Sequence, residues 1–102
     1  MHRYLVEVPH EGDAFACARV VRAFLSTGSH YLTHADWGCR DGVHKAWMIV
    51  EAESREEARW VVPAPMRESA TVVRLGRFGP QEIESILRDH GGTWDAIRAA
   101  GG

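Results

Sequence analysis

The segment Asp41-Gly-Val-His-Lys-Ala-Trp-Met-Ile-Val-Glu-Ala52 carries the clearest information on the fold of this chain. An Asp-Gly pair is a strong short-range signal for a two-residue hairpin turn. The apolar, partly β-branched run that follows it is typical of a strand. We therefore expect a strand over residues 43–52 and an antiparallel partner strand before it, over residues 30–39.

Strand and helix patterns continue on both sides of this hairpin. Asp13 and Ser54 stand where helix N-caps are expected, each just before a segment with helical character. The predicted elements are a strand over 3–9, a helix over 13–26, a helix over 55–61, a strand over 70–78, a helix over 81–90 and a short helical turn over 93–100. The order β-α-β-β-α-β with an additional C-terminal helix is the ferredoxin-like motif, an α+β fold with a four-stranded antiparallel sheet.

Length and charge limit the classes of protein to consider. The chain has 102 residues, so we expect a single domain over residues 1–102, with a core over about 3–78 and a helical extension over 80–100. The net charge is −2, whereas a protein that binds nucleic acids usually has a basic surface, so we do not expect a nucleic-acid partner. No apolar run approaches the roughly 20 residues that cross a bilayer. The N-terminus does not resemble a signal peptide, so we expect a cytoplasmic protein with free thiols and no membrane partner.

The strand over residues 43–52 is apolar on both faces. Ala46, Met48 and Val50 alternate with Trp47 and Ile49. An antiparallel sheet with one face in water would alternate between apolar and polar residues. We therefore expect a homodimer that packs through this sheet face. In the alternative, the C-terminal segment with its Trp and Ile at positions 94 and 97 folds over the sheet.

The opening Arg3-Tyr-Leu-Val-Glu7 and the later Ala18-Arg-Val-Val21, within this order of elements, resemble the dimeric α+β-barrel superfamily of small ferredoxin-like domains. That superfamily includes muconolactone isomerases, antibiotic-biosynthesis monooxygenases and small bacterial nickel-binding proteins, and the likeness is greatest to the last group. It covers roughly residues 3–78 and rests on element order and patterning. It implies a dimeric barrel with a cavity in each half that holds a metal or a small organic ligand.

Residues 30–44 concentrate side chains that bind transition metals. They hold three of the six histidines and one of the two cysteines, namely His30, His34, Cys39 and His44. Imidazole and thiolate ligands suit Ni, Zn, Fe or Cu. The spacing matches no standard zinc motif. We predict that these four residues bind a transition metal whose identity stays open.

The backbone around these residues decides which of them can meet. With a two-residue turn, Cys39 lies opposite His44 at about 4.5–5.5 Å between Cβ atoms. In an extended strand, His30 and His34 lie about 13 Å apart. In the alternative, a short helix that Ser29 caps places those two histidines one turn apart.

Other parts of the chain contribute further candidates. His2, Glu7 and His10 lie in or beside the first strand and could complete a site, because the first and third strands are neighbours in this fold. Otherwise His2 and His10 are expected at the surface, and Cys17 is expected to be a small core residue.

Three functions follow from these residues. The first is a metal-binding protein, with or without a metal-dependent reaction on a small molecule. The second is a metal-free enzyme of the monooxygenase or isomerase type, in which His34 or Glu51 acts as a general base in an apolar cavity. The third is a non-catalytic dimeric module that binds a ligand.

Overall fold

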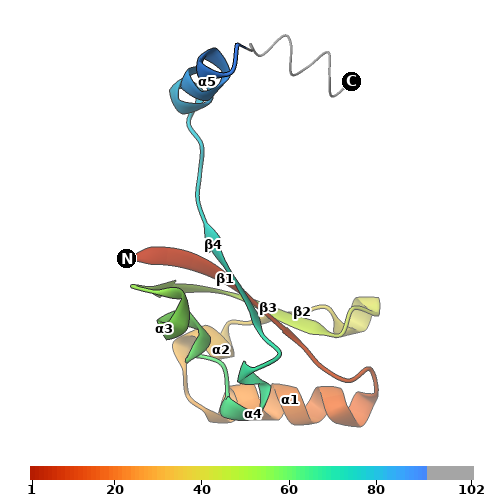
Figure 1. Cartoon of the computed structure of the whole chain (residues 1–102). Helices are drawn as coiled ribbons and strands as arrows, with labels where there is room; N and C mark the ends of the chain where they lie inside the picture. The colour runs from red at the N-terminus through yellow and green to blue at the C-terminus, as the bar shows by residue number, and fades with distance from the viewer. Residues whose placement is uncertain (92–102) are drawn as a thin grey trace.

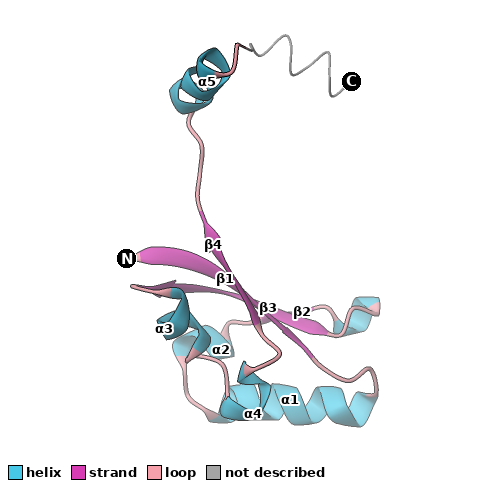
Figure 2. Cartoon of the chain, viewed as in Figure 1, coloured by secondary structure: helices cyan, strands magenta, loops and turns pink. Residues whose placement is uncertain are grey.

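A computed structural model of the chain describes residues 1–91. The four strands form one antiparallel sheet in the order β2-β3-β1-β4 (Figure 2). Helices α1 to α4 gather on one side of this sheet (Figure 1). The elements are β1 (His2–Pro9), α1 (Ala14–Ser26), α2 (His30–Thr33), β2 (Asp36–Trp37), the 3₁₀ helix η1 (Cys39–Asp41), β3 (Lys45–Ala52), α3 (Arg55–Arg59), α4 (Ala64–Arg67), β4 (Thr71–Leu75) and α5 (Pro80–Asp89). The predicted α+β class and four-stranded antiparallel sheet are confirmed, and the arrangement is compatible with a ferredoxin-like fold.

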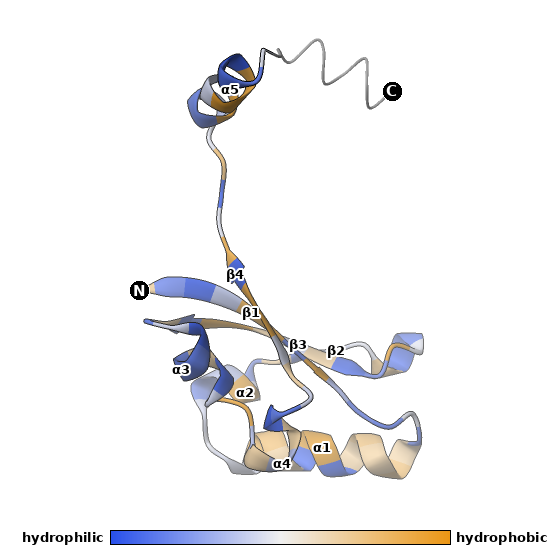
Figure 3. Cartoon of the chain, in the orientation of Figure 1, coloured by the Kyte–Doolittle hydropathy of each residue, from blue (hydrophilic) through white to orange (hydrophobic). Residues whose placement is uncertain are grey.

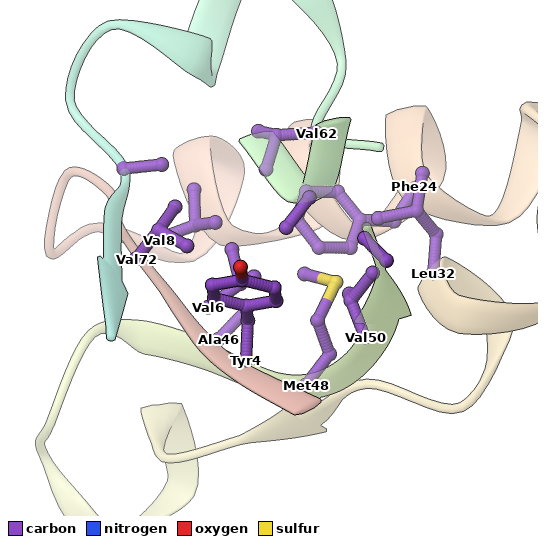
Figure 4. Close-up of a cluster of buried hydrophobic side chains, with 13 residues drawn as sticks. Tyr4, Val6, Val8, Phe24, Leu32, Ala46, Met48, Val50, Val62 and Val72 are labelled. Carbon is purple, nitrogen blue, oxygen red and sulfur yellow. The ribbon is translucent and has the colours of Figure 1, made fainter. Parts of the chain in front are cut away.

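The core lies between the sheet and the helices (Figure 4). Alternate residues of each strand point to the same face of a sheet, and in β1 and β3 one alternate set is fully or almost fully buried. Phe24 of α1 and Leu32 of α2 have no more than 1% of their surface exposed. The strand residues in this core are Tyr4, Val6, Val8, Ala46, Met48, Val50, Ala52 and Val72.

Local signals set the helix starts as the sequence predicts. The Asp13 carboxylate accepts a hydrogen bond from the backbone N–H of Ala16 at 2.8 Å. The Ser54 hydroxyl accepts one from the backbone N–H of Glu57 at 3.1 Å. Both caps satisfy N–H groups that a helix leaves without partners in its first turn. The predicted helical turn over 93–100 lies outside the described residues.

The predicted strand over residues 30–39 is wrong. Its first part is the helix α2, which follows Ser29, and its strand part is limited to Asp36–Trp37. Tertiary contacts outweigh strand propensity here: Leu32 is buried in the core, and the Tyr31 hydroxyl donates to the backbone oxygen of Glu51 at 3.3 Å. The helical alternative for this segment is therefore the correct one.

The predicted two-residue turn at Asp41-Gly42 is also wrong, although the register that it implies is found. The chain instead makes the 3₁₀ helix η1 and ends it at Gly42, whose φ of 80° is a left-handed conformation suited to glycine. Two hydrogen bonds close the loop, from Gly38 N–H to Lys45 O and from Val43 N–H to Gly38 O. Asp36 pairs with Trp47. The predicted turn, which sets Cys39 opposite His44, gives the same pairing.

The face of the sheet that α1 to α4 leave uncovered is called the open face below. It carries Leu5, Trp47, Ile49 and Val73, together with polar residues such as Glu7, which accepts a hydrogen bond from the Trp47 indole at 3.0 Å. Ile49 and Val73 are 46% and 52% exposed. The second apolar face that the sequence predicts is thus present, and no element in residues 1–91 covers it (Figure 1).

Candidate metal centre

Four possible metal ligands meet at one end of the sheet. They are His10, Cys17, Cys39 and His44, and one ligand atom from each lies within 4.8 Å of the others. They come from four places in the chain: the residue after β1, the start of α1, the 3₁₀ helix η1 and the residue before β3. This set, two thiols and two imidazoles, could bind a metal. We call it the Cys2His2 cluster.

The distances within the Cys2His2 cluster are slightly shorter than those between ligand atoms that share one ion. The Nε2 atom of His10 lies 3.1 Å from the Sγ atoms of both Cys17 and Cys39. The Nδ1 atom of His44 lies 3.3 Å from Cys17 Sγ. Around a tetrahedral zinc ion with bonds of about 2.3 Å to sulfur and about 2.0–2.1 Å to nitrogen, neighbouring ligand atoms are about 3.4–3.8 Å apart. A small expansion of the cluster therefore admits a single ion.

The antiparallel pairing of β1 and β3 brings the two histidines together. Pro9 pairs with Lys45, and the next backbone hydrogen bond runs from His10 N–H to His44 O at 3.0 Å. The two imidazole rings then meet edge to face, with 5.7 Å between their centroids. A Cβ atom at Gly12 would lie 3.3 Å from the His44 ring, so the loop between β1 and α1 packs closely on that ligand.

The two cysteines are held by short-range structure. Cys17 belongs to the first turn of α1, where its N–H donates to Asp13 O. Cys39 opens η1, directly after Gly38. A Cβ atom at Gly38 would lie 2.6 Å from the backbone oxygen of Val43 and 2.8 Å from the Trp47 ring, so only glycine lets the chain pass there. The tight turn therefore depends on Gly38.

Burial and mutual proximity tune the protonation of the cluster. Burial lowers the pKa of His10, and the nearby His44 lowers it further. His10 therefore favours the neutral imidazole, which is the form that binds metals. Its Nδ1 atom is buried without a hydrogen-bond partner among residues 1–91. Burial raises the pKa of Cys17. A hydrogen bond that the Cys17 thiol donates to Cys39 and the negative charge of Cys39 raise it further. A bound cation would reverse this effect on the thiol, because it stabilises thiolates.

Solvent reaches the Cys2His2 cluster from two sides. Cys17 and Cys39 line a groove of about 920 Å³ between α1 and the β2 region. His10 lines a second groove of about 680 Å³ on the other side of α1. All four residues are half-buried. An ion can therefore enter or leave without unfolding the domain.

The structure brings two of the four predicted metal ligands, Cys39 and His44, into the Cys2His2 cluster. The other two are not part of it: His30 begins α2, and His34 directly follows the last residue of α2. They contact each other instead, with 4.7 Å between ring centroids, and His34 Nδ1–H donates to His30 O at 2.9 Å. The predicted general bases His34 and Glu51 line one pocket of about 520 Å³ that also includes Trp47.

Two members of the Cys2His2 cluster were not among the predicted metal ligands. His10 was considered only as a residue that could complete a site, and Cys17 was assigned to the core. The signal for His10 is its position just after β1, because antiparallel pairing with β3 sets it opposite His44. The signal for Cys17 is its place in the first turn of the next helix, only seven residues after His10.

Within residues 1–91, no helix combines the length and the apolar character needed to cross a membrane. No model of a known protein family, no curated protein and no solved structure matches this chain. The resemblance to the dimeric α+β-barrel superfamily therefore stays a prediction.

Proposed function

We propose that this protein binds one transition-metal ion through His10, Cys17, Cys39 and His44, and that zinc is the ion that these ligands fit best. The observation that carries the proposal is the convergence of four ligand atoms within 4.8 Å. Two thiolates and two imidazoles in a tetrahedral shell are a common ligand set for zinc. Thiolates also bind copper(I) well, and nickel(II) and iron(II) accept the same donors.

The chemistry of the ligand set favours binding over catalysis. Catalytic zinc sites keep one position for water or substrate, whereas four protein ligands fill a tetrahedral shell. The grooves on both sides of the Cys2His2 cluster favour exchange of the ion with solvent. We infer a protein that takes up and releases a metal ion, and that gains stability at this end of the sheet when the ion is bound. A reducing compartment such as the cytoplasm would keep both thiols free for this role.

Metal analysis of the untagged protein tests the proposal. We expect about one equivalent of zinc, or uptake of one equivalent on titration of the metal-free protein. Cobalt(II) in place of zinc should give the visible absorption of tetrahedral thiolate ligation. Cys17→Ser and Cys39→Ser should each weaken binding at least a hundredfold. The matched control is His30→Ala with His34→Ala, which removes two imidazoles outside the Cys2His2 cluster and should leave the affinity unchanged.

Two results would refute metal binding at this cluster. One is less than a tenth of an equivalent of every transition metal together with no uptake on titration. The other is a loss of affinity in the His30→Ala, His34→Ala protein as large as that in the cysteine variants.

A second function is favoured by the pocket that His34 and Glu51 share with Trp47. Because His34 Nδ1–H donates to a backbone oxygen, its Nε2 atom is free to accept a proton from a bound molecule. This is the arrangement that a metal-free enzyme with a general base needs. Benzoate and phenol are suitable NMR probes: signals of the Trp47 indole should shift in the parent protein and not in His34→Ala. Equal shifts in both proteins would exclude this role for His34.

A further inference from the structure

Helix α5 stands apart from the rest of the fold (Figure 1). It has its own start signals, with Pro80 in its first turn and the Glu82 side chain accepting from Gly79 N–H. None of its ten residues is buried. Isolated helices shorter than about 12–15 residues are marginal in water. A helix of this length therefore needs a packing partner.

The spread of the chain shows that α5 leaves its own domain. The radius of gyration is 18.3 Å, whereas about 13 Å is expected for a compact domain of this size. Residues 76–79 connect β4 to α5 with no helix or strand. Fully extended, this connection spans up to about 14 Å. It carries α5 to the side of the sheet away from α1 to α4 (Figure 1).

Helix α5 has an apolar side and a polar side (Figure 3). Ile83, Ile86 and Leu87 recur at the spacing that forms a single stripe along a helix. The remaining positions carry mostly charged or polar residues. Ile86 is 42% exposed. We call these three residues the α5 stripe.

The open face of the sheet offers a matching surface. Leu5 pairs with Ile49 on one side and with Val73 on the other, which makes an apolar row across β3, β1 and β4. Three neighbouring strands span about 10 Å, and a helix of ten residues is about 15 Å long. Helix α5 is therefore long enough to lie across this row.

We propose that two copies of this chain form a dimer in which the α5 of each copy lies across the open face of the other. Within residues 1–91, each chain has one uncovered helix and one uncovered sheet face, and a twofold exchange covers all four surfaces at once. Charge supports the same pairing, because Glu82 and Glu84 of α5 would approach the end of β1 that carries Arg3 on the open face, with Arg77 in the connection that follows β4. This inference is independent of metal binding.

Sedimentation equilibrium of the full-length protein tests the dimer. The unmodified protein should be dimeric at micromolar concentration. Ile49→Arg on the open face and Ile86→Arg on the α5 stripe should each raise the dimer dissociation constant at least tenfold. Phe15→Arg is the matched control, because Phe15 is 73% exposed on α1, on the helix side of the sheet, and this variant should dimerise normally. Binding of one zinc equivalent, or an unchanged far-ultraviolet circular dichroism spectrum, verifies that each variant is folded.

Mixing the two variants distinguishes exchange of α5 from contact within one chain. In a mixed dimer, the unmodified α5 of the Ile49→Arg chain meets the unmodified face of the Ile86→Arg chain. Equal amounts of the two monomeric variants should therefore form a heterodimer of intermediate affinity. A monomeric parent protein would overturn the proposal. So would an Ile86→Arg protein that dimerises normally, or a mixture in which no heterodimer forms.

Discussion

Replacement of Gly38 by alanine is a sharp test of how the turn at residues 38–42 builds the Cys2His2 cluster. The added Cβ atom would lie 2.6 Å from Val43 O, and ordinary contact begins at 3.4 Å, so one of the two backbones must move by about 0.8 Å. Overpacking of this kind usually costs about 1–3 kcal/mol. Since Cys39 follows Gly38 and His44 follows Val43, the movement acts directly on two ligands.

We therefore expect two measurable effects of Gly38→Ala. The free energy of unfolding of the metal-free protein, from urea titration, should fall by about 1–3 kcal/mol. The zinc dissociation constant, from competition with a chromophoric chelator, should rise at least tenfold, which corresponds to about 1.4 kcal/mol.

Gly76→Ala is the matched control for this experiment. A Cβ atom at Gly76 meets nothing within 4 Å, and its φ is not in the left-handed region. This variant should keep the parent zinc affinity and lose no stability, because replacing glycine at a compatible position mainly restricts the unfolded chain. If Gly38→Ala has the same zinc affinity and stability as Gly76→Ala, the tight turn at Gly38 does not position Cys39 and His44.

Three further predictions concern the thiols, the pH dependence and the core. In the metal-free protein, Cys17 and Cys39 should both react with Ellman's reagent, and one equivalent of zinc should protect both; protection of a single thiol would contradict joint ligation. The metal-free protein should be most stable between about pH 6.5 and pH 8.5, the ordinary pKa values of histidine and cysteine. Below that range the unfolded chain protonates His10 before the folded one does, because the folded pKa is lowered, so stability falls as the pH drops. Above it the unfolded chain loses the Cys17 proton first, because the folded pKa is raised, so stability falls as the pH rises. Urea titrations across pH measure both limbs, and the alkaline limb should shrink in Cys17→Ala; a profile without either limb would refute the assignment. Finally, Phe24→Ala should cost about 3–5 kcal/mol of unfolding free energy, whereas Phe15→Ala, at a position 73% exposed, should cost far less; similar losses would mean that the core is placed wrongly.

Much of the fold could be predicted because its signals are local. The alternation of residues along β1 and β3 gives the core face, and the caps Asp13 and Ser54 mark helix starts whose hydrogen bonds are found. The prediction of a strand over residues 30–39 was wrong for a non-local reason. Its Tyr and Leu side chains suit a strand or a helix equally, and burial of Leu32 against the core decides the outcome.

The Cys2His2 cluster could be predicted only in part, because its ligands are distant in sequence. The density of histidines in residues 30–44 indicates Cys39 and His44, which share one loop. It also selects His30 and His34, which are close in sequence to the cluster and lie elsewhere in space. His10 and Cys17 enter only through the pairing of β1 with β3 and through the loop to α1. Sheet topology, more than ligand density, decides which side chains converge.

The same topology separates the Cys2His2 cluster from the surfaces of the proposed dimer. The Cys2His2 cluster lies at the end of β1 where Pro9 pairs with Lys45, and β4 departs toward α5 at the other end, where Arg3 pairs with Leu75. Along β1, Pro9 lies about 20 Å from Arg3 and about 13 Å from Leu5, which the α5 of the other copy would cover. Coupling between sites needs an element with two arrangements that both sites bias, and β1 is an inner strand of the sheet, with β3 on one side and β4 on the other. Metal binding should therefore stabilise the loop end of each copy without changing how tightly two copies associate. A zinc-free protein that still dimerises, or a monomeric variant that still binds zinc, is what this separation requires.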